Sequence, residues 1–328
     1  MPMKINSLGT VDCHFGATVT GFHIVDATDD DIQAIESAID RYAVLIFPDQ
    51  QINDAQQFAF SSKFGTMEQA TGDINQNTDR RLALDINDIS NLDQNGAVLD
   101  RNDRARLFGL GNMLWHSDSS FKAIPAKYSL LSARVVPDSG GNTEFADMRA
   151  AWAALNAEQQ AECKDLVCEH SQLYSRGALG FEDFTAEERL KWAPVTQPLV
   201  RQHPKTKTHS LFLSSHIGTI LDWPVPEARL FIRDLTEHAT RREFVFAHEW
   251  KRWDLVMWDN RVTMHRARRY DHKQPRDLHR TTVSTDTKLL QRELECIWEH
   301  LTLFCSVWDR PYSNPSICLL YTSPSPRD

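Results

Sequence analysis

The first 65 residues of the chain alternate between amphipathic and continuously apolar segments. Residues 26–42 begin with acidic side chains and then carry isoleucines at helical spacing, which predicts an amphipathic helix. Residues 43–47 (AVLIF) are all apolar, as is typical of a buried strand. A second helix is predicted to begin at Asn53 or Asp54, either of which can cap it, and to end before Gly65.

A pattern of short β-rich runs begins at residue 114 and continues to residue 284. The predicted strands are residues 114–121, 126–136, 142–145, 199–201, 210–213, 243–248, 254–258, 263–267 and 280–284. Helical insertions are predicted at residues 147–170 and 226–240. Many short strands separated by Gly and Pro turns favour a mostly β fold, a sandwich or barrel, with helical insertions.

The segment between these two parts, residues 67–110, is polar and aperiodic apart from a short predicted strand at residues 89–92. A loop of this length inside a domain is more often functional or mobile than structureless. Its charged run at residues 101–106 (RNDRAR) is interpreted as a solvated surface.

The composition is ordinary for a soluble globular protein, with 41% hydrophobic and 25% charged residues. The formal net charge of -9 disfavours nucleic acid or an anionic membrane as the main partner. No apolar run approaches the about 20 residues of a spanning helix, and the first ten residues lack the apolar core of a signal peptide. We therefore expect a cytoplasmic protein, and the sequence leaves its oligomeric state open, a homo-oligomer included.

Six cysteines occur along the chain without forming a CxxC pair, which disfavours a zinc knuckle. Without a secretory signal, a disulfide framework is not expected either. The six are Cys13, Cys163, Cys168, Cys296, Cys305 and Cys318. The first three are interpreted as buried or incidental thiols.

His116 and Asp118 lie two residues apart in the predicted strand at residues 114–121. Alternate residues of a strand point to the same face, so this imidazole and carboxylate are expected to project together. Most isolated H-x-D tripeptides hold no metal, and a third ligand must come from elsewhere in the chain. His265 is the best candidate, because it follows an apolar strand and turn at residues 254–261 that can return to the same cavity.

Two histidines and one carboxylate would leave three adjacent octahedral positions open on a metal ion. Non-haem Fe(II) oxygenases need these positions for a bidentate co-substrate and for dioxygen. Structural zinc sites are closed, a catalytic zinc would need a separate base, and the chain contains no HExxH motif. The three residues therefore favour an iron(II) site.

Two arginines follow His265 at a short distance. Arg276 and Arg280 face the same side if their segment is extended, and a guanidinium binds a carboxylate through two parallel hydrogen bonds. This suits a buried dicarboxylate co-substrate. Thr143, in a predicted strand after a glycine turn, could complete that pocket with its hydroxyl. For the arginines within residues 266–269 a surface role is favoured.

These residues lie in motifs that resemble the taurine and 2,4-dichlorophenoxyacetate dioxygenase family of Fe(II)/2-oxoglutarate oxygenases. The matching segments are LWHSDSSF (114–121), SGGNTEFADMRAAW (139–152), EHATRREFVFAHEW (237–250), DLVMWDNRVTMHRARRYD (254–271) and PRDLHRTT (275–282). The resemblance extends over about residues 8–286, and it is closest to the aryloxyacetate-cleaving branch. It implies a double-stranded β-helix, or jelly-roll, core.

The resemblance also implies roles for individual residues. The three metal candidates match the family's Fe(II) ligands, and Thr143 and Arg276 match the residues that hold the distal carboxylate of 2-oxoglutarate. Arg280 matches an arginine near the acidic group of the substrate. The implied reaction consumes 2-oxoglutarate and dioxygen and releases succinate and carbon dioxide. It hydroxylates an aryloxyacetate between the ether oxygen and the carboxylate, and the resulting hemiacetal collapses to a phenol and glyoxylate.

Further substrate contacts are expected between and just before the metal segments. His203, His209 and His216 lie between them; His216 is a candidate contact for the substrate carboxylate, and a structural role fits each of the three equally well. A hydrophobic wall for the substrate is expected from three residues before the first metal segment, Leu107, Phe108 and Leu110.

The family pattern stops after about residue 286. Residues 318–328 (CLLYTSPSPRD) look like a translated sequencing adapter, and residues 289–317 fit the same foreign extension. One dioxygenase domain is therefore expected at residues 1–287, followed by a non-native or chimeric tail at residues 288–328.

Two alternative functions stay open at this point. The same chemistry could act on a sulfonate, an alkyl sulfate or another small acid. A non-catalytic jelly-roll that only binds a ligand is disfavoured, because binding alone needs no open coordination positions.

Overall fold

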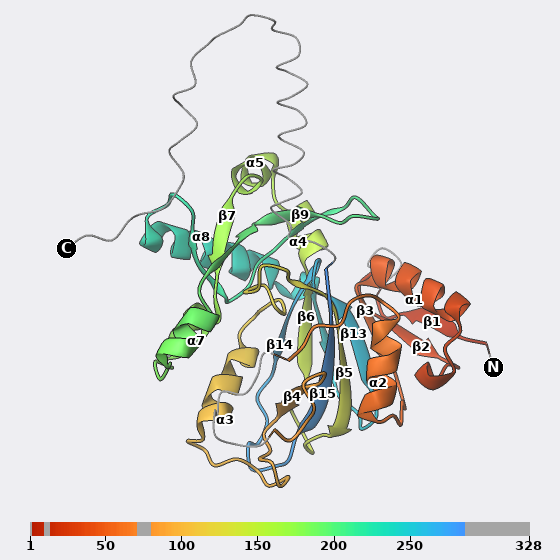
Figure 1. The fold of residues 1–328 in the computed structure, drawn as a ribbon. Coiled ribbons are helices and arrows are strands. Elements are labelled where there is room, and N and C mark those ends of the chain that lie inside the picture. The colour runs from red at the N-terminus through yellow and green to blue at the C-terminus, as the bar shows by residue number, and fades with distance from the viewer. Residues whose placement is uncertain (1, 10–13, 71–79, 286–328) are drawn as a thin grey trace, which may run out of the picture. The chain divides into compact units, whose positions relative to one another are not determined.

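The computed structural model describes residues 2–9, 14–70 and 80–285, which form four sheets with helices around them (Figure 1). The largest sheet has seven strands in the order β1-β2-β3-β13-β5-β15-β4, and only β2 and β3 run parallel. These strands are β1 (Lys4–Ser7), β2 (Ala17–Thr20), β3 (Val44–Phe47), β4 (Asn87–Ser90), β5 (Ala126–Val135), β13 (Leu255–Asp259) and β15 (Asp277–Ser284).

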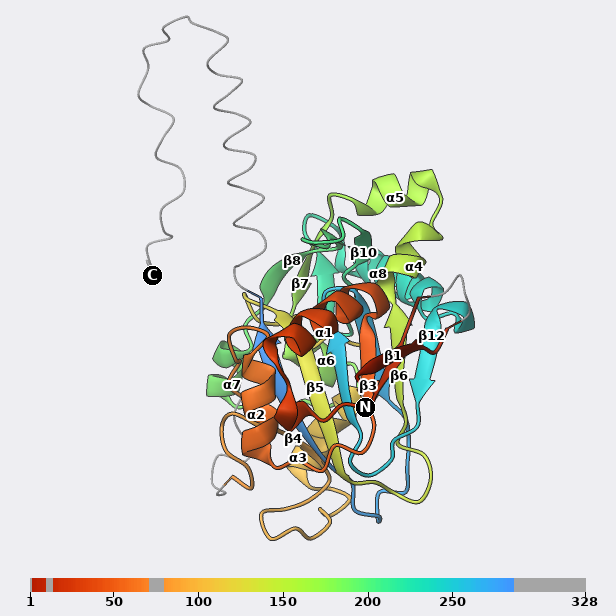
Figure 2. The ribbon, with the colours of Figure 1, turned by 90° about the vertical axis from the view of Figure 1, so that its right-hand side faces the viewer.

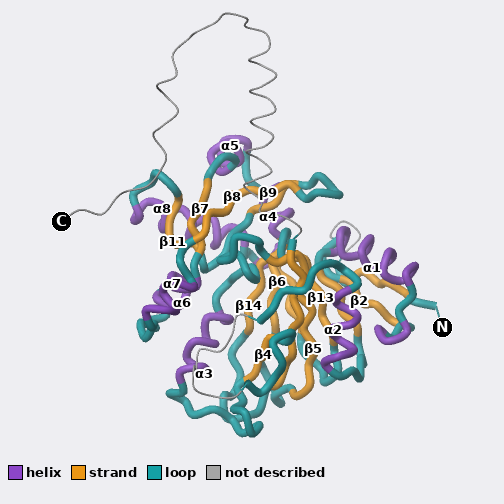
Figure 3. The backbone as a smooth tube through the Cα atoms, in the orientation of Figure 1, coloured by secondary structure: helices purple, strands orange, loops and turns teal. Residues whose placement is uncertain are grey.

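A second sheet packs against one face of the first (Figure 3). Its strands, β12 (Val245–His248), β6 (Thr143–Asp147) and β14 (Thr263–Ala267), are antiparallel. The core between the two sheets contains Phe145 of β6 and Trp258 of β13, whose ring centres are 5.5 Å apart. The two sheets therefore form a β-sandwich, and both segments that contain the candidate ligands adjoin it.

Helices α1 (Asp29–Tyr42) and α2 (Asp54–Ser62) cover the opposite face of the large sheet (Figure 2). Each begins at a capping box, which satisfies backbone N–H groups that would otherwise lack a partner: Thr28 with Asp31, and Asn53 with Gln56. Such caps typically stabilise a helix by about 1 kcal/mol.

Strand β3 has apolar residues on both of its faces. Leu45 and Phe47 pack with the helices, whereas Val44 and Ile46 pack with the core between the sheets. This alternation follows from the two-residue period of a strand, and it explains why the sequence shows a continuous apolar run here.

Of the remaining elements, α4, α5, α8 and strands β7 and β9–β11 contribute to a third apolar core beside the second sheet. The remaining strands form a three-stranded sheet, β11-β7-β8, and a two-stranded sheet, β10-β9. The strands are β7 (Val167–His170), β8 (Val195–Pro198), β9 (Val200–Gln202), β10 (His209–Leu211) and β11 (Ile217–Ile220). The α-helices are α3 (Arg104–Gly109), α4 (Met148–Ala153), α5 (Ala157–Cys163), α6 (Gln172–Gly177), α7 (Ala186–Lys191) and α8 (Val225–Ala239). The 3-10 helices are η1 (Ile24–Asp26), η2 (Leu110–Met113) and η3 (Arg242–Phe244).

The structure confirms the predicted helices α1, α2 and α8 and most of the predicted strands. The prediction of a strand at residues 114–121 was wrong. Only His116 forms a β-bridge there, and the chain turns at Ser119, whose φ of 53° is left-handed. The single helical insertion predicted at residues 147–170 was also wrong, because it contains α4, α5 and strand β7.

The charged run at residues 101–106 is not simply a solvated surface. Helix α3 begins within it, at Arg104, and Asp103 caps that helix. The Arg104 guanidinium pairs with Glu188 at 2.7 Å and with Asp183 at 3.0 Å. These ion pairs join α3 to α7 and to the loop before it.

Residues Met1–Leu289 form one unit by their internal contacts. The predicted tail lies outside the described residues, and so do Cys13, Cys296, Cys305 and Cys318. Cys163 and Cys168 are free and buried, as predicted. None of the described helices is long and apolar enough to cross a bilayer.

Candidate metal centre and acid-binding pocket

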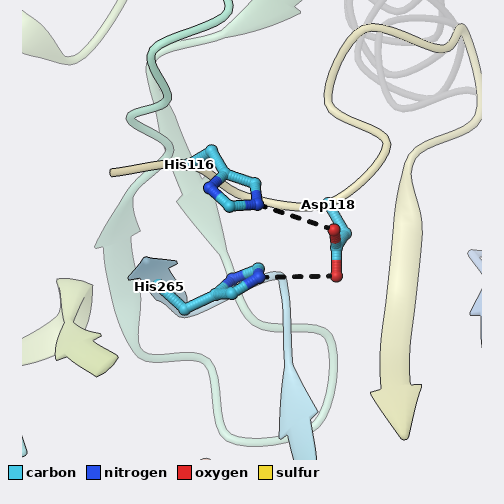
Figure 4. Close-up of side chains that lie close together, drawn as sticks. All are labelled: His116, Asp118 and His265. Carbon is cyan, nitrogen blue, oxygen red and sulfur yellow. Dashed lines mark ion pairs between the residues drawn. The ribbon is translucent and has the colours of Figure 1, made fainter. Parts of the chain in front are cut away.

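His116, Asp118 and His265 converge on one point although 146 residues separate the second from the third (Figure 4). The backbones of His116 and His265 exchange two hydrogen bonds, of 3.0 and 2.8 Å, which sets the residues opposite each other. Their imidazole centres are consequently 4.2 Å apart. Nε2 of His116 lies 3.9 Å from Oδ1 of Asp118, and Nε2 of His265 lies 3.7 Å from Oδ2.

This donor set fits a divalent transition metal. Two donors that each lie about 2.1 Å from one ion can be at most about 4.2 Å apart, and both distances to Asp118 are shorter than that. Two imidazoles and one carboxylate are the donors that non-haem Fe(II) favours. All three side chains are buried, so water competes poorly for the ion.

The protonation states of the three residues also suit metal binding. Leu114 O can only accept, so Nδ1 of His116, 2.8 Å away, donates, and the lone pair on Nε2 faces Asp118. Burial lowers the pKa of both histidines, which keeps them neutral. Burial alone would raise the pKa of Asp118, but the positive charge of Arg280 and the hydrogen bond from Ser129 oppose it, and the pKa is lowered to about 2.

A hydrogen-bond network holds the Asp118 carboxylate in place. Ser129 Oγ donates to Asp118 Oδ2 at 2.7 Å, and Asn260 Nδ2 donates to Ser129 Oγ at 2.9 Å. Asn260 Oδ1 in turn accepts from the Asp118 backbone N–H at 3.1 Å and from Trp258 Nε1 at 3.0 Å. Sequence reasoning missed these supporting residues, although Asn260 and Trp258 lie inside one of the matching motifs.

A cavity beside the two histidines brings the other predicted site residues together. Thr143, Arg276 and Arg280 all line it. The other lining residues are Ile89, Asn112, His116, Leu131, Trp258, His265 and Ala267. The cavity thus combines cations with an apolar surface, as an anionic organic ligand requires.

Arg276 is buried without a carboxylate partner among the described residues. Its guanidinium makes long contacts, 3.4 Å from Nη2 to Gly141 O and 3.5 Å from Nη1 to Ile89 O, and lies 5.6 Å from the centre of the Tyr270 ring. Burial lowers the pKa of this arginine. A guanidinium in this environment is stabilised when an anion binds beside it.

Thr143 and Arg280 also make contacts that the sequence analysis did not predict. Thr143 Oγ1 accepts a 2.9 Å hydrogen bond from Trp250 Nε1, which fixes its hydroxyl. Arg280 Nη1 donates to Asp118 Oδ1, so this arginine contacts a candidate metal ligand directly.

The three histidines between the metal segments have different environments. His216 is buried with its ring centre 6.0 Å from that of His116, and its Nδ1 lies 2.9 Å from Ser175 Oγ. His203 belongs to a separate ion-pair cluster, and His209 lies exposed beside Trp152. Only His216 therefore lies near the metal centre.

The cluster around His203 also brings together groups that could bind a metal, but cations already occupy it. His203 lies between Asp40 and Asp259, at 3.5 and 3.4 Å. Arg261 pairs with Asp259 at 2.6 Å, and Lys205 pairs with Asp40 at 3.3 Å. We interpret this cluster as a structural ion-pair network.

The prediction that residues just before the first metal segment form a hydrophobic wall for the substrate was wrong. Leu107 is 37% exposed, and Phe108 packs against Phe181 and Trp192 instead of lining the cavity. The apolar lining comes from Ile89, Leu131, Trp258 and Ala267.

Comparisons with known proteins agree with this geometry. The family described as "Taurine catabolism dioxygenase TauD, TfdA family" matches residues 6–282. The chain is 44% identical to the alpha-ketoglutarate-dependent 2,4-dichlorophenoxyacetate dioxygenase of Cupriavidus pinatubonensis, over 78% of this chain and 89% of the relative. It is 35% identical to the (S)-phenoxypropionate/alpha-ketoglutarate-dioxygenase of Delftia acidovorans, over 80% and 89%. Among solved structures it resembles AAD-2 in complex with Mn(II) and N-oxalylglycine, with 54% identity and a TM-score of 0.84 over 88% of this chain and 99% of that one.

Proposed function

The chain belongs to the TauD/TfdA family of dioxygenases, and on this premise we propose that it cleaves an aryloxyacetate-type ether to a phenol and glyoxylate. It is an Fe(II)- and 2-oxoglutarate-dependent enzyme that consumes dioxygen and releases succinate and carbon dioxide. The observation that carries the substrate proposal is the 44% identity to a 2,4-dichlorophenoxyacetate dioxygenase, combined with a cationic cavity beside the candidate ligands.

In this proposal His116, Asp118 and His265 hold the metal. When bound, Fe(II) would supply the redox chemistry that couples oxidation of the substrate to that of 2-oxoglutarate by dioxygen. Ser129 and Asn260 hold Asp118 in one orientation, and the contacts of its carboxylate with Arg280 and Ser129 keep it anionic.

Arg276 and Thr143 bind the distal carboxylate of 2-oxoglutarate. Two observations support this. The buried Arg276 guanidinium has no carboxylate partner among the described residues, and the Thr143 hydroxyl, fixed by Trp250, lines the same cavity. N-oxalylglycine, found in the solved relative, is also a dicarboxylate, so it too needs a cationic partner for its distal carboxylate.

Arg280 anchors the acidic group of the substrate and orients the carbon next to the ether oxygen towards the metal. Its contact with Asp118 keeps this guanidinium close to the ligands. Leu131 and Trp258 give the aromatic end an apolar surface and exclude water. His216 is a further candidate contact for the substrate carboxylate, supported by its position beside His116.

For the fold we propose a double-stranded β-helix, or jelly-roll. The two packed sheets and the similarity to dioxygenase structures support it. Residues 1–287 would be one dioxygenase domain and residues 288–328 a dispensable tail. A chain shortened after Thr287 should then fold and turn over substrate like the full chain. Cytoplasmic location, oligomeric state and the lack of nucleic-acid or membrane partners stay predictions.

A substrate panel tests the proposed activity. Phenol release from 2,4-dichlorophenoxyacetate that depends on both Fe(II) and 2-oxoglutarate is expected. Efficient turnover of taurine or an alkyl sulfate without phenol release would instead select the alternative, the same chemistry on another small acid.

A further inference from the structure

Arg176 is a second buried arginine without a carboxylate partner among the described residues. It belongs to α6 and is only 5% exposed. Its Nη1 donates to Ser175 Oγ at 3.0 Å, its guanidinium lies 4.5 Å from the centre of the Phe108 ring, and its Nε makes no hydrogen bond within the described part of the chain. Neutral partners compensate a buried charge poorly, so an anion that joined it would be strongly favoured.

The surroundings of Arg176 connect it to the metal-site cavity. On one side the guanidinium lies against Gly111, where an added Cβ would be 2.4 Å from the Cζ atom. The next residue, Asn112, lines the cavity. On the other side Ser175 Oγ also contacts Nδ1 of His216, which lies beside His116. Arg176 is therefore on the side of the cavity formed by Asn112 and His116.

Electrostatic coupling supports this placement. Burial is the main reason that the pKa of Arg176 is lowered to about 10, and the charge of Arg280 lowers it further. Two guanidiniums thus lie close enough to repel each other, and an anion between them would stabilise both.

We propose that Arg176 is a specificity-determining residue that binds the anionic group of the substrate together with Arg280, while Arg276 binds 2-oxoglutarate. This inference rests on the proposed function, because it requires a small acid as the ligand. The Arg280 guanidinium is already paired with the Asp118 carboxylate. The Arg276 guanidinium contacts Gly141 and lines the cavity together with Thr143. Within the described part of the chain, no acidic side chain pairs with Arg176.

A guanidinium in this position favours a small ligand whose negative charge lies on a planar carboxylate or a tetrahedral sulfonate group. A carboxylate can accept two parallel hydrogen bonds from a guanidinium, which are stronger than the present bond to the neutral Ser175 hydroxyl. A sulfonate offers the same acceptors, so the experiment must include both kinds of acid.

The test is isothermal titration calorimetry on the full chain loaded with Mn(II) and N-oxalylglycine. The ligands are 2,4-dichlorophenoxyacetate, its uncharged methyl ester and taurine, and N-oxalylglycine is titrated separately into the protein loaded with Mn(II) alone. The variants are Arg176→Gln, Arg176→Lys and Gly111→Ala, the last of which displaces the guanidinium without removing it. Arg134→Lys is the matched control, because Arg134 is also buried but pairs with Asp54, on the helix-covered side of the large sheet.

For Arg176→Gln we expect the Kd of the acid to rise about thirtyfold or more, the scale for leaving one member of a buried charge pair alone. Binding of the methyl ester and of N-oxalylglycine should stay within about twofold. Arg176→Lys should give a smaller loss because lysine keeps the charge but not the planar fork. Gly111→Ala should weaken binding of the acid, and Arg134→Lys should not.

Three results would overturn the proposal. An unchanged Kd of the acid would show that Arg176 does not bind it, and an equal loss for acid and ester would indicate a merely structural role. A loss of N-oxalylglycine binding would assign Arg176 to the co-substrate. If Arg176→Gln does not fold, the Kd values of the acid, the methyl ester and N-oxalylglycine for Gly111→Ala decide whether Arg176 binds the acid.

The outcome for the wild type separates this inference from the proposed function. If the wild type binds taurine and not the aryloxyacetate, the proposed substrate is rejected, and the same variants titrated with taurine decide the role of Arg176. A wild type that binds neither acid overturns both.

Discussion

Arg280 donates a hydrogen bond from Nη1 to Oδ1 of Asp118, which joins the expected substrate anchor to an expected metal ligand. The other carboxylate oxygen, Oδ2, accepts from Ser129 at 2.7 Å. Each oxygen of Asp118 therefore has a donor that favours the anion. An acid that binds near Arg280 would change the environment of the metal ligand as well, so binding of substrate and reactivity of the metal are expected to be coupled.

Asp118→Asn should weaken Mn(II) binding by roughly 100-fold or more, since an amide replaces the one anionic ligand. Calorimetric titration with Mn(II) measures the change. Asp254→Asn is the control: Asp254 is also buried, but it pairs with His248 at 3.1 Å outside the site and should leave Mn(II) affinity unchanged. Normal Mn(II) binding by Asp118→Asn would remove Asp118 from the ligand set.

Asn260→Ala should lower metal affinity about 10- to 100-fold while the protein remains folded, because Asn260 orients Asp118 through its backbone N–H and through Ser129. The unsatisfied buried groups should also cost about 1–3 kcal/mol in the free energy of unfolding. Asn95→Ala, at an exposed asparagine, controls for the substitution. Loss of stability with full metal affinity would limit Asn260 to a structural role.

Arg276→Lys should raise the KM for 2-oxoglutarate about 10- to 100-fold, because an ammonium cannot replace the planar fork of a guanidinium. Metal binding should not change. Steady-state kinetics with varied 2-oxoglutarate measure this, and Arg268→Lys on the exposed part of the same segment is the control. A KM like that of the wild type would reject the assignment.

The two metal segments illustrate how much of the site could be predicted from the sequence. His116 and Asp118 are near neighbours, so their pairing could be predicted locally, although the reason given was wrong because the segment is not a strand. A single β-bridge to His265 and a left-handed turn at Ser119 bring the three together instead. A left-handed turn cannot be recognised in the sequence when a serine adopts it in place of the usual glycine.

The partners of these ligands could not be predicted for a different reason. Asn260 bonds to Ser129 and to the Asp118 backbone, and Trp250 bonds to Thr143 in the neighbouring pocket; each of these bonds joins residues more than 100 positions apart, and no spacing rule connects them. Arg176 was missed because its burial depends on Gly111, 65 residues earlier. By contrast α1 and β3 could be predicted, since their periodicity and capping residues are local.

Stability should depend on pH through His279, which lies outside the metal site. Its two ring nitrogens lie 2.6 Å from Asp54 Oδ1 and 3.2 Å from Asp277 Oδ1, so the imidazolium can donate to both. Burial opposes the charge, but these two carboxylates outweigh it and raise the pKa of His279. Because the folded pKa is raised, the stabilisation is fully present below the unfolded pKa of about 6.5 and is lost as pH rises through the folded pKa.

Comparison of the wild type with His279→Gln by urea denaturation tests this. At about pH 5.5, roughly one unit below the unfolded pKa, the variant should be less stable by about 1–3 kcal/mol. The difference should shrink as the pH is raised. His209→Gln, at an exposed histidine, should show no such trend. A difference that stayed constant or grew with pH would argue against a charged His279.

Coupling between 2-oxoglutarate consumption and ether cleavage tests the central claim most directly. Wild-type protein is given Fe(II), 2-oxoglutarate, dioxygen and 2,4-dichlorophenoxyacetate, and succinate, glyoxylate and 2,4-dichlorophenol are quantified together. We predict equal amounts of the three products and none from Asp118→Asn. Succinate formation without 2,4-dichlorophenol, or 2,4-dichlorophenol released in the absence of 2-oxoglutarate, would contradict the proposed function.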